Sequence, residues 1–160
     1  MTQPFTHLDD AGHARMVDVT GKQPTVREAT AAGRVRCSAE VLAALRDGAV
    51  PKGDAFAVAR VAGIAAAKRT AELLPLAHVV GVHGVRVDLV LAEDGVDVTA
   101  TVRAADRTGV EMEALTAVSV AALALVDMVK GIDRTTSITD VRLLAKSGGQ
   151  SGPWVRSEEA

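Results

Sequence analysis

The feature that most constrains the fold is a long stretch without charge near the centre of the sequence. Residues 114–126 contain no ionisable side chain, and only Thr116 and Ser119 interrupt a series of Ala, Val and Leu, whereas charged residues crowd both ends. A helix that is apolar on every side must be buried on every side. Because a chain of 160 residues has a modest core, such burial suggests that a second subunit covers part of it. We therefore predict a central helix over residues 111–130, with function at its charged ends.

The composition is that of an ordinary globular protein. Hydrophobic residues make up 48% of the chain and charged residues 24%, which argues against a disordered chain. We predict a single domain over residues 16–146. A flexible arm over residues 1–15 is expected to precede it, and a flexible glycine-rich tail over residues 147–160 is expected to follow it.

Simple counts disfavour several classes of protein. Residues 1–16 lack the apolar stretch of a secretory signal, and no apolar run approaches the roughly eighteen residues of a membrane span. The single cysteine, Cys37, excludes an internal disulfide and a zinc site built from cysteines. A net charge of −2 and three aromatic residues give little material for binding a phosphate backbone or stacking bases. We therefore expect a cytoplasmic protein whose partners are neither membrane nor nucleic acid.

Capping residues and alternating hydrophobicity divide the chain into elements. Ser38 and Asp54 are suited to cap helices, and Asp94-Gly95 is suited to the turn of a hairpin. The expected elements are extended chain over residues 25–37, helices over 39–46 and 54–73, hairpin strands over 82–91 and 96–102, the central helix, a last strand over 137–144 and a loop over 146–154.

The order of these elements predicts the fold class. Strand, helices, strand, strand, helix, strand is the order of a split βαβ or ferredoxin-like α+β fold, in which helices cover one face of an antiparallel sheet. The other face of the sheet would then need a cover. This topology again points to an oligomer.

Charged residues at the loops and helix ends are the candidates for chemistry. Asp127 and Lys130 are three residues apart and share one helix face, either as a surface ion pair or as part of a site. Four lysines, at positions 52, 68, 130 and 146, fall where side chains either converge on an anion or scatter over the surface. Sequence spacing alone leaves both alternatives open.

Two further features are weaker signals. The segment Gly148–Gly152 could present main-chain N–H groups to a phosphate, but it lacks the strand and helix of a P-loop. His78 follows a helix stopped by proline and could act as a general acid, contact a ligand or serve the structure. The four histidines show no spacing typical of metal ligands. We therefore predict no metal site.

Six short motifs, in order along the chain, closely resemble the molybdenum cofactor biosynthesis protein C family. The most specific is Thr108-Gly109-Val110-Glu111-Met112-Glu113-Ala114-Leu115-Thr116. The others are Met16-Val17-Asp18-Val19, Lys52-Gly53-Asp54, Ala62-Gly63-Ile64 with Ala67-Lys68-Arg69-Thr70, Asp127-Met128 with Lys130, and Lys146-Ser147-Gly148-Gly149 with Ser151-Gly152. The resemblance extends from about Leu8 to Gly152.

This resemblance implies a fold, an assembly and an activity. It implies a ferredoxin-like subunit in a homohexamer of three dimers, with active sites at the dimer interface. These proteins are cyclic pyranopterin monophosphate synthases, which convert (8S)-3′,8-cyclo-7,8-dihydroguanosine 5′-triphosphate into cyclic pyranopterin monophosphate and diphosphate. No cofactor is expected, apart from magnesium that could accompany the triphosphate.

The resemblance also assigns roles to residues. By position, Lys52, Asp127 and Lys130 match the catalytic residues of the family. The matching substrate-contact and pocket residues are Leu76, Ala77, His78, Met112, Glu113, Arg27, Lys68, Glu111 and Lys146.

The sequence departs from the family pattern beside the histidine. The usual Pro-Leu-Cys-His-Pro reads Pro75-Leu76-Ala77-His78-Val79 here. Ala77 has no thiol, and Val79 restricts the backbone of His78 less than proline would. The alternative reading is therefore a catalytically impaired oligomer that still binds a pterin or nucleotide. The retained Lys52, Asp127 and Lys130 favour an active enzyme.

Lysines and a carboxylate suit the implied chemistry. Ring opening and closure of a cyclic phosphate require proton transfers, and a phosphate under attack requires cations around it. A lysine that exchanges a proton needs a pKa lowered by desolvation or by other cations, whereas substrate phosphates and Asp127 oppose that change. Which lysine exchanges the proton stays open at this stage.

Overall fold

The computed structural model describes residues 7–157 of the chain. Its elements are β1 (Thr25–Arg36), α1 (Ala39–Arg46), α2 (Ala55–Ala67), α3 (Thr70–Leu73), β2 (Val82–Ala92), β3 (Gly95–Asp106), α4 (Glu111–Val129), β4 (Ser137–Ser147) and β5 (Trp154–Val155). The first strand, the hairpin and the central helix expected from the sequence are confirmed.

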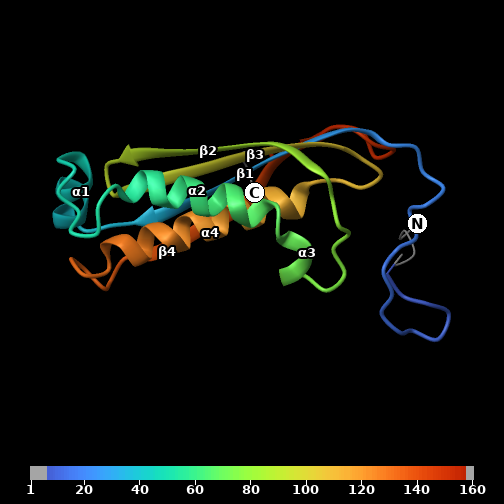
Figure 1. Cartoon of the computed structure of the whole chain (residues 1–160), viewed down its shortest axis with the longest axis horizontal. Helices are drawn as coiled ribbons and strands as arrows, with labels where there is room; N and C mark the ends of the chain where they lie inside the picture. The colour runs from blue at the N-terminus through green and yellow to red at the C-terminus, as the bar shows by residue number, and fades with distance from the viewer. Residues whose placement is uncertain (1–6, 158–160) are drawn as a thin grey trace.

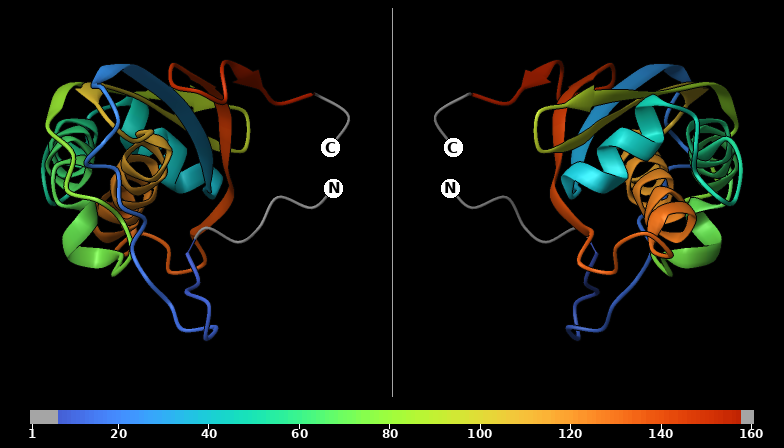
Figure 2. Two further views of the ribbon diagram at one scale, coloured as in Figure 1. Left: turned by 90° about the vertical axis from the view of Figure 1, so that its right-hand side faces the viewer. Right: turned by 90° about the vertical axis from the view of Figure 1, so that its left-hand side faces the viewer.

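The strands form one sheet in the order β2-β3-β1-β4-β5, with every neighbouring pair antiparallel. Helices α2 and α4 pack against each other on one face of the sheet, and α1 lies at one end of it (Figure 1 and Figure 2). The α+β class is therefore confirmed. Because β3 lies between β1 and β2, the strand order is compatible with the ferredoxin-like arrangement.

Small side chains bring the two long helices together. A Cβ atom on Gly63 of α2 would lie 2.8 Å from the carbonyl oxygen of Ala117 and 3.0 Å from the Cβ of Ala121, both on α4. Only glycine fits at this crossing, because the backbone of α4 cannot move away at little cost. The start of α2 consequently lies near the end of α4 (Figure 1).

The helix expected from Asp54 to about Leu73 is shorter than predicted. Asp54 caps it as expected, since its Oδ1 accepts a hydrogen bond from the N–H of Ala57 at 2.9 Å. The helix ends at Ala67, and a separate turn, α3, follows. Thr70 explains the break, because its buried hydroxyl donates to the carbonyl oxygen of Ala67 at 3.1 Å and competes with the helical pattern.

Both ends of the described chain have more structure than the sequence predicts. A loop was expected over residues 146–154, but β4 extends to Ser147 and β5 pairs with it through Trp154 and Val155. The main-chain N–H of Arg156 then donates to the carbonyl oxygen of Leu144 at 2.8 Å. In the N-terminal arm, Leu8 and Ala14 form a bridge. The remainder of the arm and tail, residues 1–6 and 158–160, lies outside the described residues.

Helix α4 is not buried on every side within one chain, so the cover by a second subunit that the sequence predicts stays a prediction. Its inner side, which includes Leu125, is fully buried, but Leu123 on the outer side is 60% exposed. Val61 of α2 is 65% exposed on the same helical layer. By length and composition alone α4 would qualify as a membrane span, a test that the core helix of a folded domain also passes. Here α4 packs on α2 and on strands β1, β3 and β4.

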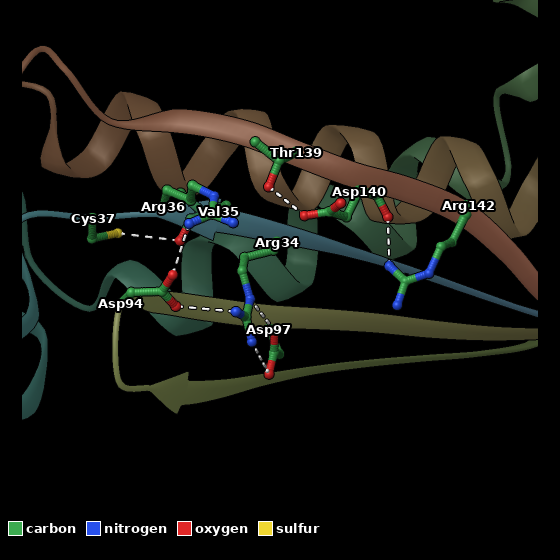
Figure 3. A network of polar contacts seen from close by, with 9 residues as sticks. All are labelled: Arg34, Val35, Arg36, Cys37, Asp94, Asp97, Thr139, Asp140 and Arg142. Carbon is green, nitrogen blue, oxygen red and sulfur yellow. Dashed lines mark hydrogen bonds and ion pairs between the residues drawn. The ribbon is translucent and has the colours of Figure 1, made fainter. Parts of the chain in front are cut away.

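The face of the sheet opposite the helices carries several polar contacts, and the cover expected for it stays a prediction. Arg34 donates from Nε to Asp97 Oδ1 at 2.8 Å and from Nη1 to Asp94 Oδ1 at 3.0 Å, and Arg36 donates to the same Asp94 (Figure 3). Thr30 and Thr101 share a hydrogen bond of 2.9 Å on neighbouring strands. Exposed apolar side chains lie on both layers, for example Leu123 on α4, and Val26 and Val90 on the sheet.

Candidate active site

Three predicted catalytic residues meet at the C-terminal end of α4. The Asp127 carboxylate receives Lys130 Nζ at 2.6 Å on Oδ1 and Lys52 Nζ at 2.9 Å on Oδ2. Lys52 also donates to the main-chain carbonyl oxygen of Asp127 at 2.8 Å. That carbonyl belongs to the last turn of the helix, where main-chain oxygens lack helical partners and attract cations. One carboxylate thus holds two ammonium groups side by side.

The electrostatics of this triad, Lys52, Asp127 and Lys130, are those of an exposed site. The Asp127 side chain is 55% exposed, and both lysines are similarly open to solvent. Hydrogen bonds from Lys130 and then Lys52 lower the pKa of the Asp127 carboxyl to about 2. The carboxylate is therefore charged at every physiological pH, and the three side chains together carry a net positive charge. An anion is the ligand that this arrangement favours.

A second set of predicted residues surrounds a cavity of about 1070 Å³ at the opposite end of α4. The cavity is mainly apolar, and carboxylates enter it only from the first turn of the helix. Its predicted lining residues are Leu76, Ala77, His78, Glu111, Met112 and Glu113, and it is also lined by His7, Ala14, Thr108, Gly109 and Leu143. A cavity of this size and polarity can enclose a flat heterocycle.

The two glutamates of the first helical turn differ in their surroundings. Glu113 is only 4% exposed, and burial, with the nearby Glu111 and Asp106 charges, raises the pKa of its carboxyl. Glu111 is more open and lies 3.8 Å from Lys146 Nζ. A Cβ atom on Gly109 would collide with the Glu111 carboxylate. The glycine before the helix therefore leaves room for this carboxylate.

The remaining pocket residues lie at the same end of the fold. Arg27 donates from Nε to the carbonyl oxygen of Asp106 at 3.3 Å. Any side chain on Gly149, whose φ is +75°, would occupy the place of the Arg27 guanidinium. Lys146 bonds the hydroxyl of Ser151 in the glycine-rich segment, and Lys68 caps the C-terminus of α2. The glycines of this segment thus pack around side chains of the subunit itself.

The structure brings the triad residues together at one end of α4 and the cavity residues together at the other end, and it keeps the two groups apart. From Glu111 to Asp127 is sixteen residues of helix, which is about 24 Å at about 1.5 Å per residue. The triad lies at the α1 end of the molecule, and the cavity lies at the α3 end (Figure 1). Within one subunit, no ligand of nucleotide size can touch both.

Comparison with known proteins identifies the chain. A model of the MoaC family matches residues 16–149. The chain belongs to the MoaC family. Among curated members, the cyclic pyranopterin monophosphate synthase of Streptomyces coelicolor is 61% identical over 96% of this chain and 90% of its own length. That of Chloroflexus aurantiacus is 57% identical over 95% of this chain and 94% of its own length.

A third MoaC-family relative, the cyclic pyranopterin monophosphate synthase 2 of Mycobacterium tuberculosis, is 56% identical over 95% of this chain and 91% of its own length. The matched region of the MoaC family includes both the triad and the cavity residues on α4.

Sequence reasoning missed one contact at this site: His78 Nε2 lies 2.6 Å from the main-chain oxygen of Val17. No side-chain pattern could have predicted it, because the partner is a main-chain atom.

Proposed function

We propose that this chain is a cyclic pyranopterin monophosphate synthase of molybdenum cofactor biosynthesis. It converts (8S)-3′,8-cyclo-7,8-dihydroguanosine 5′-triphosphate into cyclic pyranopterin monophosphate and releases diphosphate, which makes it a lyase. The observation that carries the proposal is the Asp127 carboxylate holding Lys52 and Lys130 in contact with solvent. The named relatives, which cover nearly the whole chain, support the same activity.

The triad, Lys52, Asp127 and Lys130, suits the phosphate end of this reaction. The α-phosphate gains negative charge when it is attacked, and diphosphate leaves with its own charge, so fixed cations stabilise both changes. Asp127 orients the two ammonium groups in advance, because it is charged over the whole physiological pH range. When an anionic substrate binds the ammonium group of one of these two lysines, the other lysine can donate a proton to the leaving diphosphate or to the opening ring of the substrate.

The cavity suits the purine-derived end of the same substrate. Its apolar walls can enclose the ring system, while Glu111, Glu113 and His78 offer polar contacts at its edge. Burial raises the pKa of the Glu113 carboxyl, and this carboxyl can accept a hydrogen bond from a ring N–H when charged, or donate one to a ring nitrogen or carbonyl group when protonated. Lys68, Arg27 and Lys146 add positive charge at this end.

A second subunit resolves the separation of the two sets, and we include it in the proposal. In a two-fold dimer whose α4 helices run antiparallel, the triad end of one copy meets the cavity end of the other. The exposed apolar side chains Leu123 and Val61 lie on the helical layer that such a dimer would cover. The proposed assembly is a homohexamer, built as three such dimers, in the cytoplasm.

Mixing two inactive variants tests both the activity and the shared site. Lys130→Ala disables the triad, and Glu111→Gln disables the cavity. In mixed dimers one of the two sites contains only unaltered residues, so reassembled equal mixtures should recover about a quarter of the parent activity. Each variant alone should remain inactive. Product formation is measured as pyranopterin and diphosphate. A site contained within one subunit would give no recovery.

The alanine at position 77 supports one alternative function, that of a family member with weakened catalysis. It lines the cavity where the usual motif has a cysteine. Restoring the thiol with Ala77→Cys should leave turnover within a few-fold of the parent if the thiol has no catalytic role. A gain of several orders of magnitude would instead identify this chain as an impaired enzyme. The same assays, with and without a chelator, determine whether magnesium accompanies the triphosphate.

A further inference from the structure

The segment before β1 lies against the cavity in an ordered conformation. Residues 16–22, here called the N-terminal strap, alternate between exposed positions such as Met16 and Asp18 and half-buried ones at Val17 and Val19. This alternation shows that one edge of the extended strap faces the body of the subunit. The strap lies outside any helix or strand of the described fold, so its position needs a separate explanation.

One contact closes a turn at the C-terminal side of the strap, and a second contact anchors this side to the body of the subunit. The N–H of Lys22 donates to the carbonyl oxygen of Val19 at 3.0 Å and closes a turn. The guanidinium of Arg107, which follows β3, donates from Nε to the carbonyl oxygen of Lys22 at 2.8 Å. Both contacts are made to the main chain of the strap, and Asp18 Oδ1 accepts from the N–H of Thr20 within it at 2.8 Å.

A third contact joins the strap to the cavity. His78 Nε2 lies 2.6 Å from the carbonyl oxygen of Val17. A carbonyl oxygen can only accept a hydrogen bond, so Nε2 must carry the proton. In a neutral imidazole Nδ1 is then unprotonated and can only accept. His78 lines the cavity, and Nδ1 is the ring nitrogen left for a ligand.

We infer that the main-chain carbonyl of Val17 sets the tautomer of His78, which makes the strap a positioning element of the site. It holds His78 as a hydrogen-bond acceptor toward the cavity. The inference deepens the proposed function, on which its kinetic readout rests, but its structural readout is independent of turnover. His7 and Ala14 from the preceding segment line the same cavity, which places these two residues at this end of the site.

Two nested deletions separate the strap from the segment before it. Deleting residues 2–14 retains Val17, whereas deleting residues 2–18 removes it. Both deletions remove His7 and His13, so His78 and His83 are the only remaining histidines. His83 serves as an internal reference, because its Nδ1 accepts from the N–H of Ala105 at 3.3 Å, away from the strap.

Nitrogen NMR of ¹⁵N-histidine-labelled protein reports the tautomer directly. At a pH where both rings are neutral, the deletion of 2–14 should show His78 with protonated Nε2 and unprotonated Nδ1. The deletion of 2–18 should show His78 with averaged nitrogen signals from both tautomers, while His83 is unchanged. Identical His78 signals in the two deletions would overturn the inference, as would a mixed tautomer in the full-length protein.

Kinetics provide a second readout on the same samples. Loss of the hydrogen bond from His78 to Val17 should lower the population of the His78 tautomer with protonated Nε2. The value of kcat should fall with it, about 2- to 12-fold, with a smaller change in KM. A strap that only shapes the cavity would instead raise KM and leave the tautomer fixed. A protein without any turnover would refute the proposed function, whereas the NMR comparison would still decide the role of Val17.

A point variant keeps the test valid if the longer deletion does not fold. Arg107 is exposed, so Arg107→Ala removes the anchor at Lys22 without creating a buried vacancy. Amide hydrogen exchange of Lys22, whose N–H donates to Val19, should become faster in this variant, and His78 should show both tautomers. Arg86→Ala on β2, which breaks an exposed ion pair with Asp88, is the matched control and should change neither. An unaltered tautomer despite faster exchange would refute the inference.

Discussion

Lys52 and Asp127 are joined twice, since Lys52 Nζ donates both to the carboxylate, at 2.9 Å, and to the main-chain carbonyl oxygen, at 2.8 Å, of the same residue. The second contact ties the loop before α2 to the last turn of α4. Because the carbonyl cannot rotate away, Lys52 stays in place even when a ligand displaces the carboxylate. Among these contacts, Lys130 has only the carboxylate as a partner, so a ligand that displaces the carboxylate releases Lys130 and not Lys52.

Lys130→Ala should lower turnover at least about 100-fold, the usual contribution of a positioned proton donor or acceptor. The melting temperature should stay close to that of the parent, because exposed ion pairs contribute little to stability. Steady-state turnover and thermal melting are measured on the same samples. Arg86→Ala breaks another exposed pair, with Asp88 at 2.7 Å, and should retain parent turnover. Near-parent turnover in folded Lys130→Ala would leave Lys52 as the proton-transfer candidate.

The pKa of Asp127 predicts how acid affects the triad, Lys52, Asp127 and Lys130. Its value is lowered from 3.8 to about 2 by Lys130 and Lys52, so between these values the unfolded chain binds the proton more readily than the folded one. The stability contributed by the triad is therefore full above pH 3.8 and is lost as the pH falls towards 2. Melting curves from pH 2 to 6 should show the parent losing more stability than Asp127→Asn. Parallel losses would contradict the lowered pKa.

The contribution of Glu113 to stability should depend on pH in the opposite direction to that of Asp127. Burial, followed by the Glu111 and Asp106 charges, raises its pKa above 4.5. The folded protein then holds this proton more tightly than the unfolded chain, so Glu113 lowers stability as the pH rises above 4.5. The melting temperature of Glu113→Gln minus that of the parent should therefore grow between pH 4 and pH 8. A constant difference would show that Glu113 ionises as an exposed glutamate does.

Gly109→Ala should impair the site and spare the fold. The added Cβ collides with the Glu111 carboxylate, the movable end of a side chain, and not with the main chain. Substrate affinity should fall about tenfold or more, as when a charged hydrogen-bonding group is lost, while melting changes little. Gly84→Ala is the control, because its Cβ would lie at an ordinary 3.9 Å from the Cβ of Arg103. Unchanged affinity in Gly109→Ala would exclude Glu111 from substrate binding.

Much of the fold could be predicted from local sequence signals. Asp54 caps its helix as predicted, because capping depends on a few neighbouring residues. The predicted hairpin also forms, but its two turn residues are Glu93 and Asp94, one position earlier than expected, since Gly95 pairs with Ala92. The break after Ala67 could not be predicted, since the hydroxyl of Thr70 can serve either a helix or a turn. The hydrophobic pattern predicts that one subunit leaves part of α4 uncovered, as it does at Leu123, but the pattern does not tell which surface covers that part.

The site was predictable in part. The spacing of Asp127 and Lys130 places them on one face, but the approach of Lys52 depends on how α2 packs on α4, which depends on Gly63 and Ala117. The resemblance to a family assigned roles to both groups of residues. It could not reveal their separation along α4, which is a property of the folded subunit. The contact of His78 with Val17 involves a main-chain atom and leaves no side-chain pattern.

The last prediction concerns the exposed apolar face of the helical layer and its role in forming the oligomer. Leu123 on α4 and Val90 on β2 are both 60% exposed, but only Leu123 lies on the face that the proposed dimer covers. Leu123→Lys would bury an unpaired charge in that interface, which is costly. It should dissociate the oligomer in light scattering and lower turnover by orders of magnitude, while circular dichroism stays native. Val90→Lys should change neither property. An intact oligomer in Leu123→Lys would place the interface elsewhere and remove the physical basis for a site shared by two antiparallel α4 helices.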